Sequence, residues 1–407
     1  MRIGMLLDKP FPPDPRVANE ARSLVAAGHE VHLLCLRFEA ETPAREIWHG
    51  IEVHRRLIDP FFYRKASALA LVLPAYFQFF ARVLRAFLSE TRVEALHVHD
   101  LPLLAVGLQE AERRGLPVVS DLHENWPAAI ANYDYARRFP GNLLISPERW
   151  RAYERKHLPR AARVIVVVDE SAERLPAYGI PRDRIAVVSN TVQVDEFEGF
   201  PRDAEIEGRG RAGFTVAYLG GFDRHRGLET AVRALGQLRD WAELRLLLVG
   251  DGATRGALER EVHRHGLGDR VEFAGWQPFR LFPSFVAGAS VALIPHLKSE
   301  HTDTTIPHKL FHYMLLERAV VSTDCLPLAR IVESTGAGRI YASGDPVALA
   351  SRLRELRDPQ LRAELGAKGR SAVLERYRWD LTARTLVDLY RDLHAERGAA
   401  EQRGDGR

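Results

Sequence analysis

Short, unbroken apolar runs recur along this chain, and stretches with the period of an amphipathic helix separate them. A strand that is apolar on both sides lies between two covering layers, which is typical of a parallel sheet flanked by helices. In the first half of the chain we expect such strands at residues 2–7, 31–36, 95–99, 117–122, 163–168 and 185–190. In the second half we expect them at residues 214–220, 244–250, 271–275, 291–295 and 319–323.

A polar stretch rich in glycine and arginine interrupts this alternation once, near the middle of the chain. Two βα series separated by one linker predict an α/β protein with two Rossmann-like, doubly wound domains. We expect an N-terminal domain over residues 1–200, a linker over 201–213 and a C-terminal domain over 214–378. We also expect a final helix over 379–396 that packs back toward the N-terminal domain, and a disordered tail over 397–407.

The composition is that of a globular protein, and its charges are nearly balanced. Lys and Arg number 57 against 54 Asp and Glu, so no global field requires nucleic acid as a partner. The two cysteines, Cys35 and Cys325, form no metal-binding or disulfide pattern, which favours the reducing cytoplasm. The apolar residues 67–80 contain Pro74 and fall short of the ~20 residues that span a bilayer. We expect an amphipathic helix there, with peripheral contact to the inner face of the membrane left open.

Two loops of the second domain carry residues suited to an anion. Gly220 and Gly221 follow its first strand and let backbone N–H groups approach a ligand, while Arg224 and Arg226 add fixed charge before a helix. Lys309 falls in the first turn of a later helix, where the helix dipole disfavours a cation unless an anion binds nearby. We therefore expect both loops to hold one diphosphate; the alternative is a glycine turn with solvated arginines.

The same helix is expected to begin at Thr305, whose hydroxyl suits an N-cap, with Pro307 in the first turn. Four histidines lie nearby, and two of them are one helical turn apart. A zinc site would require further ligands in a recognisable frame, and the sequence shows none. We therefore expect no metal at His296, His301, His308 and His312.

A series of short motifs occurs in a fixed order along the chain. These are DPRVANEARSLVAAGHEV (14–31), DLHE (121–124), SNTVQVDEF (189–197), YLGGF (218–222), VGDG (249–252), VEFAGW (271–276) and PHKLFHYM (307–314). Their order and spacing resemble the large bacterial family of retaining glycosyltransferases with the GT-B fold, the group 1 or GT4-like type. The resemblance covers nearly the whole chain and implies two domains that face each other across a cleft.

The resemblance also implies an activity and partners. The donor would be a nucleoside-diphosphate sugar, and the acceptor a glycan or a lipid-linked molecule in the synthesis of a cell-surface polysaccharide or glycoconjugate. It implies catalytic roles for Arg226 and Lys309, which would bind the diphosphate and neutralise it as it leaves, so no cofactor and no metal are expected. It also implies that His123 lies near the sugar; the alternative for His123 is a packed imidazole bonded to the backbone.

Further donor contacts are implied around Gly250 and around Gly275 and Trp276, the latter pair near the base. The family usually carries two glutamates eight residues apart, one near the sugar and one on the ribose. This chain has Thr304 and His312 at those positions, with Thr305 beside the first. A hydroxyl and an imidazole can still bond sugar or ribose hydroxyls, and Asp303 can replace the first carboxylate.

The substitution of both glutamates leaves a second hypothesis open, a transferase-like chain that lost its chemistry and serves as a nucleotide-binding or partner subunit. A third, a nucleotide-sugar epimerase on the same double fold, lacks this order of motifs. On the acceptor side we expect Arg16, His99 and Glu124, which lie in loops after strands or at strand ends. A salt bridge from Arg16 to Glu20 is the alternative for that arginine, and His97 is expected to be buried.

Overall fold

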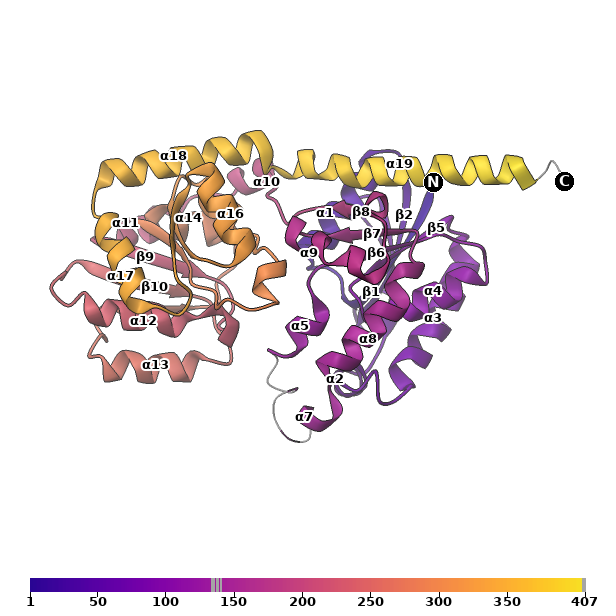
Figure 1. The fold of residues 1–407 in the computed structure, drawn as a ribbon, viewed down its shortest axis with the longest axis horizontal. Helices are drawn as coiled ribbons and strands as arrows, with labels where there is room; N and C mark the ends of the chain where they lie inside the picture. The colour runs from indigo at the N-terminus through magenta and orange to yellow at the C-terminus, as the bar shows by residue number, and fades with distance from the viewer. Residues whose placement is uncertain (133–135, 137–138, 140, 405–407) are drawn as a thin grey trace. The chain divides into compact units, whose positions relative to one another are not determined.

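The computed structural model describes residues 1–132, 136, 139 and 141–404, and the chain forms two compact units (Figure 1). Unit 1 comprises Met1–Ser189 together with Thr382–Arg407, and unit 2 comprises Asn190–Leu381. Each unit is built on a sheet that is mainly parallel in unit 1 and entirely parallel in unit 2, with helices packed against it. The predicted class of two Rossmann-like domains is therefore confirmed.

The sheet of unit 1 has the strand order β3-β4-β2-β1-β5-β6-β7-β8, and β3 alone among these strands pairs antiparallel to its neighbour. The edge strand β3 and its neighbour β4 were not expected, because β4 alternates polar and apolar residues and so lacks an unbroken apolar run. The strands are β1 (Arg2–Pro10), β2 (Glu30–Arg37), β3 (Arg45–Trp48), β4 (Ile51–Leu57), β5 (Ala95–His99), β6 (Val118–Leu122), β7 (Arg163–Val166) and β8 (Ile185–Val187).

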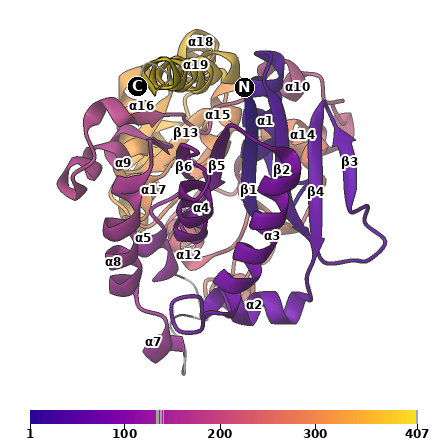
Figure 2. The ribbon, with the colours of Figure 1, turned by 90° about the vertical axis from the view of Figure 1, so that its right-hand side faces the viewer.

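The helices of unit 1 begin where the sequence supplies caps. The first, α1 (Pro15–Ala26), starts after Asp14, whose carboxylate accepts a hydrogen bond from the Val17 amide, and Pro15 occupies its first turn. Figure 2 shows α3 and α4 side by side on one face of the sheet. The remaining helices of this unit before the crossing are α2 (Pro60–Ala68), α3 (Ala75–Thr91), α4 (Leu104–Glu112), α5 (Trp126–Ile130), α7 (Gly141–Leu144), α8 (Pro147–His157) and α9 (Asp169–Glu173).

The apolar segment of residues 67–80 is divided between α2 and α3, with Pro74 at the start of the second helix. The buried stripe of α3 includes Tyr76, Phe80 and Leu84, spaced by a full turn, so one side of this helix faces the core. None of the helices in the described residues combines the length and the apolar character required to cross a membrane.

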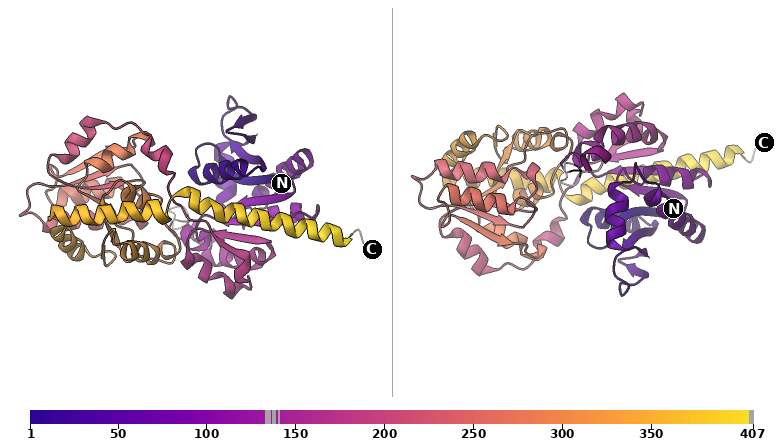
Figure 3. Two further views of the ribbon diagram at one scale, coloured as in Figure 1. Left: turned by 90° about the horizontal axis from the view of Figure 1, so that it is seen from above. Right: turned by 90° about the horizontal axis from the view of Figure 1, so that it is seen from below.

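The last helix, α19 (Trp379–Gly404), passes from unit 2 into unit 1 at Thr382 and lies along unit 1 in both views of Figure 3. Arg397 donates a hydrogen bond to the Glu94 carbonyl, and Glu396 pairs with Arg163. The prediction of a disordered tail is wrong for residues 397–404, which continue the helix; residues 405–407 lie outside the described part. Alanine, glutamate, glutamine and arginine in this stretch favour a helix.

Unit 2 has the strand order β11-β10-β9-β12-β13-β14, and every neighbouring pair is parallel. Its helices are α10 (Val194–Glu198), α11 (Ala204–Arg211), α12 (Leu228–Gln237), α13 (Arg255–Arg264), α14 (Phe282–Gly288), α15 (Lys309–Leu315), α16 (Leu326–Thr335), α17 (Pro346–Glu355) and α18 (Pro359–Arg376). Its strands are β9 (Phe214–Leu219), β10 (Leu244–Val249), β11 (Val271–Gly275), β12 (Val291–Ile294), β13 (Ala319–Thr323) and β14 (Gly338–Tyr341).

The predicted linker over 201–213 is wrong, because the chain leaves unit 1 at Ser189 and this stretch holds helix α11 of unit 2. Asp203 caps α11 by accepting hydrogen bonds from two backbone amides. A Cβ at Gly210 would lie 2.8 Å from the Gly288 carbonyl oxygen, so the glycines let α11 pack directly on α14. Glycine here serves close packing and not flexibility.

In each sheet the strand order reverses once, between β1 and β5 in unit 1 and between β9 and β12 in unit 2. In doubly wound folds ligands bind beyond the carboxyl ends of the strands at such a reversal. The loops after these strands hold Arg226 and His296 in unit 2, and Asp100 in unit 1. The topology therefore predicts ligand sites at these two strand-order reversals.

Candidate active site

Lys309 of unit 2 rests on the glycine loop that follows β9. Its ammonium nitrogen lies 3.9 Å from the centre of the Tyr218 ring. A Cβ at Gly220 would come within 2.5 Å of that nitrogen, so the absence of a side chain at Gly220 makes room for the lysine. The structure thus brings together the two loops that the sequence analysis joined through a diphosphate.

Arg226 is the second cation of this place, and a glycine holds its loop in position. Its Nη1 donates to Nε2 of His296, which follows β12, at 3.0 Å. Burial keeps the pKa of His296 well below its ordinary value, so the imidazole is neutral and accepts this bond. Gly227 has φ of 65°, and a Cβ there would lie 2.0 Å from the Pro295 carbonyl oxygen. The loop can therefore approach the end of β12 closely with glycine at 227.

Neither Arg226 nor Lys309 forms an ion pair with a carboxylate among the described residues. Burial, followed by the charge of Arg226, holds the pKa of Lys309 well below its ordinary value, and Asp223 opposes this shift. The Nε of Arg226 is buried and donates its hydrogen to no partner among the described residues. Two neighbouring cations without a matching anion form a place that an anionic ligand would stabilise.

The strand ends around this place fit together through glycines. Gly250 has φ of 135°, and a Cβ there would lie 2.0 Å from the Gly220 carbonyl oxygen. The Gly250 amide donates to the Gly275 carbonyl at 2.7 Å, and the Tyr218 hydroxyl donates to the Gly221 carbonyl at 2.7 Å. These contacts align the carboxyl ends of β9, β10 and β11. Trp276, directly after β11, is 68% exposed and free to stack on a flat ligand.

Arg224 is the predicted residue of this loop that the structure leaves apart. Its side chain is exposed, and within the described residues it makes no hydrogen bond or ion pair. Arg226 is therefore the arginine that the fold places beside Lys309 and His296.

The prediction that Thr305 caps the following helix is wrong. Thr305 is extended, with φ of −145°, and α15 begins at Lys309. Ile306 precedes a proline, a position that disfavours helical backbone, so the helix starts only after Pro307. Thr304 is half-buried, and its hydroxyl donates to the Glu300 carbonyl at 2.6 Å. The Asp303 carboxylate accepts from the Leu326 amide at 2.8 Å and so serves the start of α16.

His312 does not present its imidazole to a ligand, which corrects the expectation of a ribose contact. The ring is buried and lies 4.4 Å, between ring centres, from Phe197. Phe279 and Phe282 pack around it at 5.6 and 5.3 Å. Burial lowers the pKa of His312 to about 3, so the ring is neutral. A period of 3.6 places this position of α15 on the apolar side, and all of α15 after Lys309 is buried.

In unit 1, His123 directly follows β6 and lies between two carboxylates. Its Nε2 donates to Oδ2 of Asp121 at 2.8 Å, and its Nδ1 lies 3.6 Å from Oδ2 of Asp100. Burial alone would lower the pKa of His123, but the charges of Asp100 and Asp121 raise it to about 9. The two carboxylates therefore favour the protonated form of the imidazole.

Asp121 is the centre of this buried cluster. Arg16 donates to both of its oxygens, at 2.6 and 3.1 Å, and lies 2.9 Å from Glu20. Burial alone would raise the pKa of Asp121, yet Arg16 and His123 hold it well below its ordinary value. Burial raises the pKa of Glu20 to about 8. The cluster thus combines an ionised carboxylate with two cations.

Two further histidines of β5 surround Asp121. Nδ1 of His99 lies 3.2 Å from Asp121, and Nε2 of His97 lies 3.6 Å from it. Nδ1 of His97 lies 2.9 Å from the hydroxyl of Tyr390 on α19. Burial lowers the pKa of both histidines, that of His99 to about 3, so both rings are neutral. The expectation that His97 is buried is confirmed.

The acceptor-side expectations need a correction. Arg16 and His99 are 3% and 1% exposed, and their polar atoms are turned toward Asp121. They support the strand end from within and do not line a surface. Glu124 is half-buried beside His123. Asp100 and Asp121 were not predicted as partners of His123, although both stand at strand ends in HVHD and DLHE.

Asp100 has an unusual backbone. Its φ of 62° places it in the left-handed region, which aspartate adopts more readily than most residues. Its Oδ2 accepts a hydrogen bond from Lys9 at 3.0 Å, and its carboxylate is buried. Strained residues that the surrounding structure holds in place cluster at functional sites.

Four side chains of this cluster could offer one metal ligand atom each, all within 4.8 Å of one another: Glu20, His97, His99 and Asp121. Arg16 already binds both carboxylates, so their charge is matched by the guanidinium. A divalent ion would add two positive charges beside Arg16 and a protonated His123. This electrostatic arrangement disfavours a metal.

A second group of possible ligands joins His32 on β2 to Glu52 and His54 on β4. Nε2 of His32 lies 2.8 Å from Glu30, and its Nδ1 lies 3.2 Å from Glu52. A histidine bridging two surface glutamates accounts for this geometry without a metal. Among the described residues neither group includes the histidines of residues 296–312.

Comparison with known proteins places this architecture. The model of Glycosyltransferase Family 4 matches residues 16–196, and that of Glycosyl transferases group 1 matches residues 213–358. The D-inositol 3-phosphate glycosyltransferase of Acidothermus cellulolyticus is 28% identical, over 94% of this chain and 86% of its own length. The phosphatidyl-myo-inositol mannosyltransferase of Mycolicibacterium smegmatis is 27% identical, over 96% of this chain and 93% of its own.

A solved structure agrees with the fold. Sucrose-phosphate synthase from Thermosynechococcus elongatus superposes with a TM-score of 0.80 at 20% identity, covering 97% of this chain and 99% of its own. At this identity the likeness concerns the fold. It matches the GT-B class predicted from the sequence.

Proposed function

Because the chain belongs to the family 4, group 1 glycosyltransferases, we propose that it is a retaining hexosyltransferase that uses a nucleoside-diphosphate sugar. The acceptor is a hydroxyl of a glycan or lipid-linked molecule in the synthesis of a cell-surface polysaccharide or glycoconjugate. One observation carries the donor assignment: Arg226 and Lys309 lie together on the glycine loop after β9 without a carboxylate to pair with among the described residues. A diphosphate matches their charge.

The proposed reaction proceeds on one face of the sugar. The bond from the anomeric carbon to the diphosphate oxygen breaks, and the acceptor oxygen bonds to the same carbon. The proton of the acceptor hydroxyl passes to the departing phosphate. Arg226 and Lys309 stabilise the negative charge that develops on this phosphate, so the proposal requires no metal and no cofactor. Gly220, Gly221, Gly250, Gly275 and Trp276 supply the surface on which the nucleotide rests.

Calorimetry with UDP, GDP, ADP, TDP and CMP tests the donor site. We expect one nucleoside diphosphate to bind, with an affinity at least tenfold lower in Lys309→Ala. Arg239→Ala is the matched control, since Arg239 is exposed and bonds a backbone carbonyl of His265. A ligand at 100 times its Kd raises the stability of the folded state by about 2.7 kcal/mol, so thermal shifts report the same binding. Equal affinity in Lys309→Ala would contradict the assignment.

Two further measurements test the finer parts of the proposal. Excess EDTA should leave the transfer rate unchanged, whereas a metal-dependent enzyme would lose activity. The NMR coupling of the anomeric proton should show the same configuration in the product as in the donor. An inverted product would contradict retention.

Thr304 and His312 support a second candidate, a transferase-like subunit that binds nucleotide without turnover. Both positions hold glutamate in the family, and here one side chain is bonded to its own turn and the other is buried among phenylalanines. Nucleotide binding that persists while no acceptor or water accepts the sugar would favour this candidate. Release of free nucleotide that depends on an acceptor would favour the transferase.

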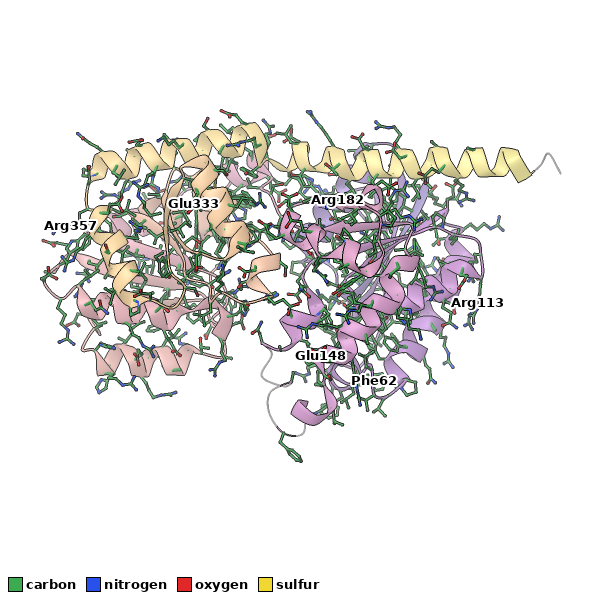
Figure 4. The ribbon with its side chains drawn as sticks, viewed as in Figure 1. Phe62, Arg113, Glu148, Arg182, Glu333 and Arg357 are labelled. Atoms are coloured by element: carbon green, nitrogen blue, oxygen red, sulfur yellow. The ribbon has the colours of Figure 1, made fainter. Side chains whose placement is uncertain are left out.

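The lipid-linked acceptor and a peripheral membrane location are supported by α2. Phe61 is 64% exposed and Phe62 is 42% exposed, and Figure 4 labels Phe62 beside this helix. Arg64 and Lys65 are exposed on the same helix, and Leu73 after it is 50% exposed. Apolar side chains flanked by cations suit the anionic inner face of a membrane, so we place the protein in the cytoplasm against that face.

Sedimentation with vesicles tests this surface. The protein should sediment with phosphatidylcholine vesicles that contain phosphatidylglycerol and less with pure phosphatidylcholine. Phe61→Ser combined with Phe62→Ser should abolish sedimentation. Trp276→Ser, which removes an equally exposed aromatic ring from unit 2, should not. Loss in the control alone would contradict the role of α2.

A further inference from the structure

Both ring nitrogens of His123 face carboxylates that are held ionised by other cations. Nε2 donates to Asp121 at 2.8 Å, and Arg16 binds both oxygens of the same carboxylate. Nδ1 lies 3.6 Å from Asp100, which accepts from Lys9 at 3.0 Å. A neutral imidazole has one nitrogen without a hydrogen, and that lone pair would face a negatively charged oxygen here. The geometry therefore favours hydrogen on both nitrogens.

The elements packed against His123 contribute charged or titratable groups, and the carboxylates among them favour a positively charged ring. Nδ1 of His99 lies 3.2 Å from Nε2 of His123 and points at the same Asp121 oxygen. The groups that face the ring are Asp8 and Lys9 from β1, Arg16 and Glu20 from α1, His97 and His99 from β5, Asp100 after β5, and Asp121 from β6.

We propose that Asp121 and Asp100 are positioning residues that keep the His123 ring protonated on both nitrogens. His123 then serves sugar transfer as a fixed cation and not as a proton acceptor. The role of His123 in sugar transfer rests on the proposed function, whereas the protonation state of its ring rests on the geometry of unit 1.

The backbone conformation of Asp100 is an independent indication that its carboxylate has a positioning role. Its φ of 62° costs free energy for a residue with a side chain, and the pairing with Lys9 and His123 offsets that cost. The side chain of His123 is 14% exposed, so part of the charged ring reaches the surface of the strand end. A ring in this state attracts an anionic or hydroxyl oxygen but cannot take the proton of an acceptor hydroxyl. That proton must go to another base, which in the proposed reaction is the departing phosphate.

Titration of the histidine resonances by NMR tests the ring state without any substrate. The His123 signal is identified by its loss in His123→Asn. We expect it to titrate near pH 9 in the native protein, since the charges of Asp100 and Asp121 outweigh the effect of burial on its pKa. In Asp100→Asn the pKa should fall by about one unit or more, equivalent to a tenfold shift in the protonation ratio. Asparagine tolerates the left-handed backbone, so this variant keeps the fold.

Asp121→Asn should lower the pKa of His123 further. If Asp121→Asn fails to fold, the titration of Asp100→Asn alone tests the proposal. Glu110→Gln is the matched control, because Glu110 of α4 is a buried carboxylate of the same unit that pairs with Arg85 of α3. It should leave the His123 titration unchanged. A native His123 that titrates below pH 7, or an unchanged pKa in Asp100→Asn, would overturn the proposal.

The pH profile of kcat/KM gives a readout that a purely structural role would not move. The raised pKa means that the charge is present below pH 9 and is lost as the pH rises through 9. The rate should therefore be level from about pH 6 to 8 and fall above that range, with the fall moved to lower pH in Asp100→Asn. A general base would instead show a rate that rises with pH. If no transfer is found at all, the proposed function fails, and the NMR titration still decides the state of the ring.

Discussion

The two strand-order reversals of this protein are built with opposite electrostatics. In unit 1 every strong charge at the carboxyl edge has a partner in the same unit: Arg16 pairs with Asp121, and Lys9 pairs with Asp100. In unit 2 the described residues offer no carboxylate partner to Arg226 or Lys309. The charges of the unit 1 cluster are therefore matched within the unit, whereas an anionic ligand would be needed to match those of unit 2.

In the proposed reaction, this contrast would suit two kinds of substrate. A neutral hydroxyl acceptor is best met by dipoles and charges that are already balanced and fixed. A diphosphate brings its own negative charge, so the site that receives it should be left with excess positive charge. The strand-order reversal thus holds a network of ion pairs in unit 1, and in unit 2 it holds Arg226 and Lys309 without carboxylate partners among the described residues.

The largest expected effect comes from deleting the arginine of each unit in turn. Arg16→Met removes the guanidinium that Asp121 and Glu20 share and leaves His123 as the remaining cation at Asp121, which should lower the free energy of unfolding by about 3–5 kcal/mol. Arg226→Met removes no ion pair with a carboxylate among the described residues and should leave the stability within about 1 kcal/mol. Urea unfolding of both variants measures the difference. Equal losses would break the comparison.

Lys309→Ala should act on turnover and not on folding. The loss of one charge that stabilises the departing phosphate should lower kcat about 10²–10³-fold. Removal of a buried cation with a depressed pKa should leave the melting temperature unchanged or raise it. Arg224→Ala, in the same loop but exposed, should lower kcat much less. Steady-state kinetics of the two variants assign the second cation, and a larger effect at Arg224 would reverse the assignment.

Gly220→Ala tests the close approach of Lys309 to the glycine loop. The new Cβ would lie 2.5 Å from the lysine nitrogen, and φ of 136° is a region that is almost restricted to glycine. We expect a loss of about 1–3 kcal/mol in stability together with weaker nucleotide binding. Gly208→Ala, in a helix with no atoms near the new Cβ, should be neutral or slightly stabilising. Nucleotide affinity that survives in Gly220→Ala would show that Lys309 does not need this contact.

The smallest effect is expected at His312. Among the described residues its Nδ1 is buried without a hydrogen-bond partner, so His312→Leu removes an unsatisfied polar atom from an aromatic cluster. Stability should change by less than about 1 kcal/mol, and nucleotide affinity by less than twofold. Unfolding and calorimetry measure the two quantities. A tenfold loss of affinity would restore His312 as a ligand of the ribose.

The strands that could be predicted are those whose apolar runs are unbroken. β9, β10 and β12 carry no interruption that matters, and their buried pattern matches the sequence. The edge strands β3 and β14 were missed because they are short and keep polar residues, and β4 was missed because its apolar residues alternate with polar ones. The stretch 201–213 misled for a related reason. Its glycines look like flexibility, but their purpose emerges only when α14 is packed against them.

The role of a site residue could be predicted where its type and local sequence indicate one use, and could not be predicted where burial by distant segments determines that role. Lys309 at a helix start beside a glycine loop is a local signal, and the fold joined it to Arg226. Arg16 and His99 look like loop residues that reach a ligand, yet three-dimensional packing turns both toward Asp121. His312 has an identity typical of binding, but its position on α15 faces phenylalanines. Burial is the quantity that the sequence could not supply.

Helix α19 makes unit 1 discontinuous along the chain, whereas unit 2 is a single stretch of residues. All of unit 2 is therefore synthesised before Tyr390, the residue that contacts His97 in the buried cluster. Unit 2 has its full sequence once Leu381 has been added, whereas unit 1 cannot complete its buried polar cluster until α19 has been synthesised. A message cut short after Leu381 would yield a complete unit 2 together with a unit 1 that lacks most of α19.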